Sequence, residues 1–352
     1  MPRARRPGWR GLVAIFLVGV AIVIGAGALL VPVLPEPTGA LAVGRDRLTW
    51  VDAVRPEIVT PDQNDKREYV VESWYPAVRG SGADPSYLPD LSRVRGGLIE
   101  SGEFGWYEVL GMQLVRSHAR VGAEVLDGRP RHPVVVLSPG NATNVEFYAS
   151  LAEDLASRGF VVLGINHPYD VAAVALSDGR VAVLPVEEPA SMAARVDHVA
   201  LRVDERAADV ASVVDRVRRS DGALGRLRER VDPERIAVIG HSLGGIAAAR
   251  ACSTDRRLRS CANLDGLQGG GPFSVRPGGQ MPGQPFLLIT KEPSAERFAS
   301  PNVETKIIAG ATHRDFTDGP MIEPSLSART NSVEVMQLVR QQLASFLERT
   351  LR

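Results

Sequence analysis

The amino-acid sequence predicts an α/β fold with a mostly parallel central sheet and helices on both faces. The β-branched run 133–137 is followed by a helical pattern and then by a second apolar run at 160–165, the order of a strand–helix–strand unit. A third apolar run, 236–239, leads through a glycine-rich turn into a helix of small residues. Further expected strands at 260–264 and 285–290 extend the alternation of strands and helices that is typical of a parallel sheet.

Residues 1–33 are typical of a membrane-targeting segment. Four arginines within residues 1–10 precede an uncharged run at 11–33, which as a helix spans roughly 30 Å or slightly more, the thickness of a bilayer core. Because positive flanks stay inside, residues 1–10 are expected in the cytosol and the rest of the chain outside. We expect a single-pass signal-anchor in the cell membrane. Cleavage near residues 40–42, the alternative, would make the protein secreted.

Residues 34–48 are expected to link this anchor to one catalytic domain at 49–352, because the beginning of the segment is rich in Pro, Gly and Ala. Residues 68–75 have strand composition, and the polar stretch 79–95 is expected to be a loop. The apolar, aromatic stretch 104–116 has two interpretations. It is either a core helix, which we favour, or part of the entrance to an apolar pocket.

The remaining elements follow from periodicity and from glycine or proline stops. They are a helix at 146–158, a short hairpin arm at 181–184, a long valine-faced helix at 193–219, a strand at 305–309 and a C-terminal helix at 333–351. No internal repeat and no long linker divides this part of the chain.

The segment RIAVIGHSLGGIAAAR, residues 235–250, contains the candidate nucleophile. Its pattern predicts a strand, a tight turn and a helix with Ser242 at the apex, which is the context of a nucleophile elbow in the α/β-hydrolase fold. A side chain at Gly240 or Gly244 would collide with the neighbouring strand or helix. The pentapeptide G-x-S-x-G alone is a weak signal, and a tightly packed structural turn is the competing interpretation.

A serine hydroxyl needs an adjacent base, and the base needs an orienting acid. In this fold the chain order is serine, acid and histidine, and His313 is the only histidine after Ser242. His241 should point away from Ser242, and His167 should be a structural hydrogen-bonding residue. The acid stays open between Asp265 and Glu292, each at the end of a strand, with Asp265 slightly favoured.

Three other aspartates, Asp255, Asp315 and Asp318, also lie downstream of the nucleophile and are expected in surface loops. The oxyanion hole should use the backbone N–H of Leu243, the residue after the nucleophile. Its partner should come from the loop after residues 133–137, around Asn141.

The two cysteines, Cys252 and Cys261, are expected to form a disulfide, because an even count is typical of an exported domain. It would join the helix after the nucleophile to the next strand. Two separate buried thiols are the alternative.

Composition argues against several other functions. The formal net charge is zero, so a nucleic-acid-binding surface is not expected. The sequence has no H-E-x-x-H segment, no Cys/His cluster and no G-x-G-x-x-G turn. We therefore expect neither a metal ion nor another cofactor.

From residue 68 to residue 313 the sequence resembles the plasma-type platelet-activating factor acetylhydrolases and their bacterial lipase-like relatives. The shared motifs are WYP, VVVLSPG, LASRGFVVLGINHPYD, GHSLGG, NLDG and THRDFTD. The resemblance implies Asp265 as the acid and His313 as the base, with Phe316 and Asp318 following it. The chain departs from the family where Pro139-Gly140 stands in place of the frequent His-Gly, a change that keeps backbone donation and bears on substrate preference.

Together these features predict a serine carboxylic-ester hydrolase, and the resemblance implies lipid-like or short-acyl esters as its substrates. A polyester hydrolase like the cutinases, or an acyltransferase with the same triad, is the alternative within the fold. A non-catalytic binding module is the alternative from another class.

Overall fold

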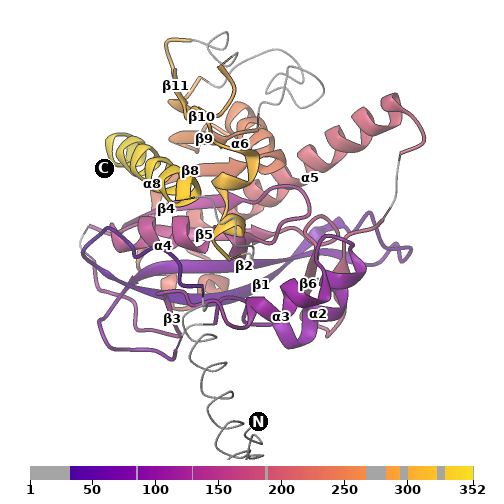
Figure 1. Ribbon diagram of the computed structural model, residues 1–352, viewed down its shortest axis with the longest axis horizontal. Helices are drawn as coiled ribbons and strands as arrows, with labels where there is room; N and C mark the ends of the chain where they lie inside the picture. Colours follow the sequence, from indigo (N-terminus) through magenta and orange to yellow (C-terminus); the bar gives the residue numbers. More distant parts are fainter. Residues whose placement is uncertain are drawn as a thin grey trace, which may run out of the picture.

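The predicted mostly parallel sheet runs through the whole protein (Figure 1). The computed structural model describes residues 32–84, 86–128, 130–186, 189–266, 283–293, 300–322 and 330–351. Within these ranges the sheet has the strand order β11-β10-β9-β8-β4-β5-β2-β1-β3. Its strands are β1 (Ala42–Pro56), β2 (Lys66–Ala77), β3 (Arg120–Val121), β4 (His132–Ser138), β5 (Val161–Asn166), β8 (Val231–His241), β9 (Ser260–Leu264), β10 (Phe286–Thr290) and β11 (Val303–Ile307).

The strands from β5 through β4 and β8 to β11 pair in parallel, whereas β2 pairs antiparallel with both β5 and β1. The chain passes from β4 to β5 on one side and later returns as β8 on the other side of β4. The carboxyl ends of β4 and β8 therefore form a topological switch point, the usual place for a ligand site in open α/β sheets.

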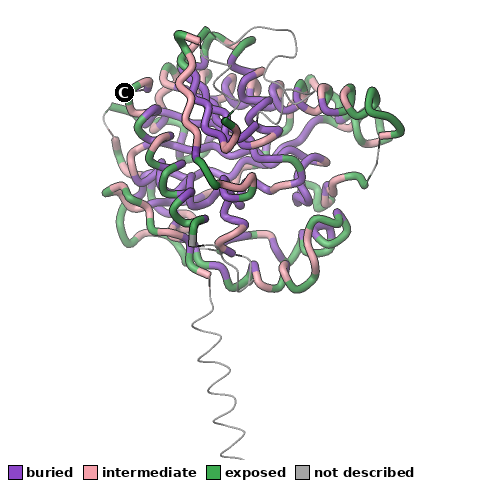
Figure 2. The backbone as a smooth tube through the Cα atoms, turned by 45° about the horizontal axis from the view of Figure 1, so that its top comes forward, coloured by how far each residue is buried: buried purple, intermediate pink, exposed green. Residues whose placement is uncertain are grey.

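Helices cover both faces of this sheet (Figure 1). On β4, Val135 and Leu137 pack in one core with α4 (Ala149–Ser157) and α8 (Thr330–Leu351). The alternating residues Val134 and Val136 pack in the other core with α5 (Met192–Arg218) and α6 (Leu243–Thr254). Both faces of the strand are thus buried, as expected for a central parallel strand (Figure 2).

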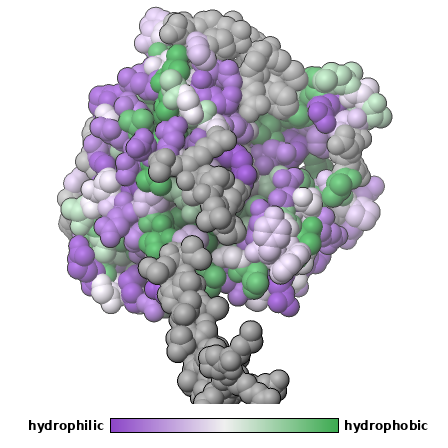
Figure 3. Space-filling view, viewed as in Figure 1, coloured by the Kyte–Doolittle hydropathy of each residue, from purple (hydrophilic) through white to green (hydrophobic). Residues whose placement is uncertain are grey.

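Smaller elements complete the fold around the sheet. They are α2 (Leu91–Glu100), α3 (Trp106–Met112), the hairpin of β6 (Ala173–Ala175) and β7 (Val181–Val183), α7 (Gly319–Ile322) and the 3₁₀ helices η1 (Val145–Tyr148), η2 (Gly222–Leu227) and η4 (His313–Phe316). The outer end of α5 projects from the body (Figure 1). There Met192 and Leu201 are exposed, and apolar surface is visible in Figure 3.

Three local predictions were wrong. The expected linker 34–48 ends early, because β1 begins at Ala42 and Leu34 is already buried with its N–H bonded to Arg116. The expected loop 79–95 contains the start of α2. The expected helix 146–158 begins as the 3₁₀ turn η1 before α4.

The predicted cytosolic segment 1–10 and residues 11–31 of the predicted anchor lie outside the described residues. Among the helices that are described, none combines the length and apolar character needed to cross a bilayer.

Candidate active site

Ser242 lies at the sharp turn between β8 and α6. Its backbone has φ 54° and ψ −121°, a conformation that costs free energy in a residue other than glycine. The flanking glycines allow the turn to close. A Cβ at Gly240 would lie 2.1 Å from the carbonyl oxygen of Gly244, and a Cβ at Gly244 would lie 2.2 Å from that of Ser138. Both collisions agree with the sequence analysis.

His313 and Asp265 lie next to Ser242 in one line of hydrogen bonds. Nε2 of His313 is 2.9 Å from Oγ of Ser242, and Nδ1 is 2.6 Å from Oδ2 of Asp265. Asp265 directly follows β9, the strand beside β8, and His313 begins η4 after β11. Three residues far apart in sequence thus meet at the carboxyl edge of the sheet, in the geometry of a nucleophile, a base and an orienting acid.

The carboxylate of Asp265 is held in its ionised form. Burial acts to raise its pKa, but hydrogen bonds from His313, from the Thr290 hydroxyl at 2.7 Å and from the Lys291 N–H at 3.2 Å lower the pKa below its usual value. An ionised carboxylate at this position can accept a hydrogen bond from the Nδ1–H of His313, which places the unprotonated nitrogen, Nε2, toward Ser242.

The other acidic candidates contact different groups. Glu292 pairs with Lys291, and its N–H bonds to the Thr290 hydroxyl. Asp315 and Asp318 were expected in surface loops, and this was wrong because both are buried. Asp315 accepts hydrogen bonds from Thr312 and Ser332, and Asp318 from Ser150.

Ser242 and His313 border a cavity of about 510 Å³. The apolar wall of this cavity is formed by Phe104, Met112, Phe147 and Ile322. Asn141 lines the cavity together with Ser242. The prediction of plain core packing for residues 104–116 was therefore wrong in part. Phe104 and Met112 line the cavity, and Trp106 on α3 is 69% exposed.

Of the expected oxyanion donors, Asn141 borders this cavity, and Leu243 borders a second cavity that Ser242 and Asn141 also line. Leu243 is the first residue of α6, so its N–H lies among the unpaired donors of a helix N-terminus. Asn141 follows β4 and borders the cavity together with Ser242. Two N–H groups on either side of a serine are suited to stabilising negative charge on a substrate oxygen.

A hydrogen-bonded chain joins the loop after β4 to the backbone of His313. The Gly140 N–H donates to the Tyr148 hydroxyl at 2.9 Å, and this hydroxyl is 2.8 Å from Nδ1 of His241. Nε2 of His241 is 3.1 Å from the carbonyl oxygen of His313. Burial, with the nearby His313, lowers the pKa of His241 to about 3, so its ring is neutral and donates from Nε2.

A second Ser–His–Asp line lies beneath the same loop but is fully buried. Oγ of Ser138 is 3.0 Å from Nε2 of His167, and Nδ1 of His167 is 2.8 Å from Oδ2 of Asp209. Burial lowers the pKa of His167 to about 4. Since no substrate reaches these atoms, the line is structural, and the expectation for His167 is confirmed.

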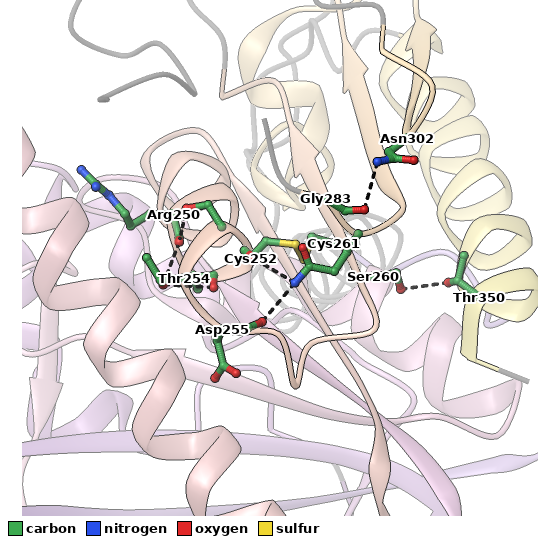
Figure 4. The surroundings of a disulfide bond; sticks show 12 residues. Arg250, Cys252, Thr254, Asp255, Ser260, Cys261, Gly283, Asn302 and Thr350 are labelled. Carbon is green, nitrogen blue, oxygen red and sulfur yellow. Dashed lines mark hydrogen bonds between the residues drawn. A yellow bond between two sulfur atoms is a disulfide. The ribbon is translucent and has the colours of Figure 1, made fainter. Parts of the chain in front are cut away.

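Cys252 and Cys261 form a disulfide between the end of α6 and the start of β9 (Figure 4). The bridge fixes the connection between the helix that follows Ser242 and the strand that leads to Asp265. Among the described residues, no group of three or more His, Cys, Asp or Glu side chains is arranged to hold a metal ion.

The sequence analysis missed the polar residues behind the site, above all Arg206, Asp209 and Tyr148. A signal was present for two of them. Arg206 and Asp209 lie on the same buried face of α5 as Val203 and Val210. Charged residues on the apolar face of a helix are rarely buried without a partner, and could have been recognised as part of a polar network.

Comparison with known proteins identifies the family of this chain. The family model of platelet-activating factor acetylhydrolase, isoform II, matches residues 33–351. A probable 1-alkyl-2-acetylglycerophosphocholine esterase of Arthroderma benhamiae is 25% identical over 76% of this chain and 68% of its own length. The platelet-activating factor acetylhydrolase of Cavia porcellus is 25% identical over 79% of this chain and 71% of its own length.

Among solved structures, a ferulic acid esterase from Streptomyces cinnamoneus superimposes with a TM-score of 0.70 at 26% identity. The match covers 92% of this chain and 94% of that chain. The resemblance inferred from short motifs is thereby confirmed over nearly the whole described chain. The chain belongs to the platelet-activating factor acetylhydrolase, isoform II, family, a family of esterases with the α/β-hydrolase fold.

Proposed function

We propose that this esterase hydrolyses lipid-like or short-acyl carboxylic esters through Ser242, His313 and Asp265. The observation that carries the proposal is the line of two hydrogen bonds, 2.9 Å and 2.6 Å, that connects these three side chains. The apolar wall of the adjoining cavity supports an acyl or alkyl chain as the group bound there. The names of the two relatives support an acetylated glycerophospholipid as one candidate substrate.

In this mechanism His313 takes the proton of the Ser242 hydroxyl while Oγ attacks the ester carbonyl. The N–H groups of Leu243 and Asn141 stabilise the resulting oxyanion, and loss of one such donor costs about 3 kcal/mol. His313 then protonates the departing alcohol, leaving an acyl group on Ser242. Water, deprotonated by the same histidine, releases the acid and restores the serine.

The test uses p-nitrophenyl esters from acetate to palmitate with the wild-type full chain and with Ser242→Ala. We expect turnover in the wild type, loss of at least about 10³-fold in the variant, and fluorophosphonate labelling of Ser242 alone. Equal turnover by both proteins would refute the mechanism. Absence of turnover and of labelling would favour a binding module. Ester product formed with an added alcohol would identify acyl transfer.

The expected anchor was residues 11–33, but its last two residues, Pro32 and Val33, pair with Arg116 in the folded domain. We therefore also propose that residues 11–31 anchor the chain with the folded domain outside the cytoplasm. The disulfide supports this location, because disulfides persist in oxidising compartments and are rare in the cytosol. Fractionation of cells that express the full chain is the test. We expect it in the membrane fraction and accessible to protease in intact spheroplasts. Protease resistance until lysis would contradict the proposed orientation.

A further inference from the structure

Arg206 on α5 is a fully buried arginine that binds the backbone of the loop after β4. Its guanidinium donates to the carbonyl oxygens of two consecutive residues, Pro139 and Gly140, the latter at 3.2 Å. Its Nε donates to the carboxylate of Asp170, which balances the charge. Burial lowers the pKa of Arg206 to about 9, so the group remains a cation at neutral pH.

The hydrogen bond from Arg206 to the carbonyl oxygen of Gly140 determines the direction of the N–H of Asn141. The peptide bond between Gly140 and Asn141 is planar, and in a trans peptide its C=O and N–H point in opposite directions. With the carbonyl turned toward Arg206, the N–H of Asn141 is turned away from Arg206.

The neighbouring N–H groups of the loop are all occupied. That of Gly140 donates to Tyr148, that of Ala142 to the carbonyl of Asp170 at 3.1 Å, and that of Thr143 to the carbonyl of Gly140 at 3.4 Å. The N–H of Asn141 has no partner among the hydrogen bonds of the described residues. It is therefore available to a ligand.

This N–H lies close to the reacting serine. A Cβ built on Gly140 would be 3.5 Å from Cβ of Ser242, and Asn141 borders both cavities that reach Ser242. We infer that Arg206 is a positioning residue that orients the peptide between Gly140 and Asn141, so that the Asn141 N–H serves the oxyanion hole. The inference rests on the proposed function and adds a cause for the orientation of this donor.

The test replaces Arg206 by lysine in the full chain and compares kcat and KM for a p-nitrophenyl ester and for its thionoester, in which C=S replaces C=O. Lysine keeps the charge but cannot span two carbonyls and a carboxylate as a planar guanidinium does. We expect kcat for the ester to fall about 10- to 100-fold, with KM changed less than about threefold. N–H donors stabilise a developing oxyanion better than a thiolate-like sulfur, so the ester/thionoester ratio should fall too.

Arg340 provides a matched control. It is 2% exposed and, like Arg206, donates to two consecutive carbonyls, those of Pro35 and Glu36, and pairs with an aspartate, Asp154. It is absent from the lining of both cavities beside Ser242. Arg340→Lys should lower the melting temperature without changing kcat or the ester/thionoester ratio.

An unchanged kcat in Arg206→Lys, or a lower kcat with an unchanged ratio, would overturn the inference. So would an equal fall of the ratio in Arg340→Lys. If Arg206→Lys does not fold, Asp170→Asn serves instead, because it removes the charge that holds the guanidinium, and the ratio should fall in the same direction. Activity retained by Ser242→Ala would instead refute the proposed function itself, whatever the arginine variants do.

Discussion

Nδ1 of His313 lies 2.6 Å from Oδ2 of Asp265, and the two residues differ sharply in accessibility. The Asp265 side chain is 1% exposed, whereas that of His313 is 31% exposed. The carboxylate thus holds the imidazole from the buried side, while the ring stays open to the cavity on the side of Ser242. This arrangement fixes the ring and leaves Nε2 facing the Ser242 hydroxyl, as the proposed mechanism requires.

Asp265→Asn should lower kcat for p-nitrophenyl acetate by about 10³- to 10⁴-fold. An amide can donate its N–H to Nδ1, which moves the ring proton to Nε2 and removes the base that faces Ser242. Steady-state kinetics at pH 7 would measure the effect, and circular dichroism would verify that the variant folds.

Glu292→Gln is the control, because Glu292 lies just after the next strand, β10, and is the alternative acid on sequence grounds. Its side chain pairs with Lys291 on the surface, so kcat should remain within about twofold of the wild type. If kcat fell strongly in Glu292→Gln and little in Asp265→Asn, our assignment of Asp265 as the acid would be wrong.

The sequence could predict the sheet core and the candidate triad because their signals are local. The strands β4 and β10 each contain a continuous apolar run, because both of their faces are buried. The order of Ser242 and His313 in the chain left one histidine for the base. Asp265 needed the family resemblance, because strand ends alone did not separate it from Glu292.

The parts that could not be predicted depend on distant partners. The strand β1 has alternating and charged residues such as Arg45 and Arg47, and it becomes a strand because β2 pairs along its length. Arg206 gains its role from carbonyl oxygens more than 60 residues away. No local pattern encodes which backbone atoms a buried guanidinium will meet.

Gly244→Ala should abolish folding or activity. The added methyl group would lie 2.2 Å from the backbone oxygen of Ser138 and 2.3 Å from that of Pro139, and backbone atoms cannot move aside as a flexible side chain does.

The control is Gly111→Ala in α3, where a Cβ meets nothing within 4 Å. It should stabilise the fold by roughly 0.5–1 kcal/mol, because alanine favours helix more than glycine. Soluble yield, urea unfolding and kcat should be measured for both glycine variants. Wild-type activity in Gly244→Ala would contradict the elbow geometry.

Replacing Cys252 and Cys261 together by serine should lower the free energy of unfolding by about 2–3 kcal/mol, because the bridge closes a loop with a sequence separation of 9. The catalytic side chains do not include either cysteine, so kcat at 25 °C should change little. Urea unfolding under reducing conditions should bring the midpoint of the wild type close to that of this variant. A midpoint equal to that of the oxidised wild type would show that the bridge adds no stability.

Acidification should destabilise the protein between about pH 6.5 and pH 4 through His167. The folded-state pKa of about 4 lies below the ordinary value of 6.5, so the unfolded chain binds a proton first as the pH falls. The contribution of His167 to the free energy of unfolding is therefore greatest above pH 6.5 and decreases by roughly 3 kcal/mol by pH 4. Burial raises the pKa of Asp318 to about 7, so this carboxyl contributes in the opposite direction over the same range in wild type and variants alike. Urea titrations at pH 7, 6, 5 and 4 measure this dependence of the free energy of unfolding on pH.

His167→Gln should make this pH dependence smaller, although it should not remove it, because the pKa of buried His241 is lowered as well. His198→Gln, at an exposed position of α5, should leave it unchanged. An identical slope in wild type and His167→Gln would mean that the buried Ser138–His167–Asp209 line takes up its proton as readily as the unfolded chain does.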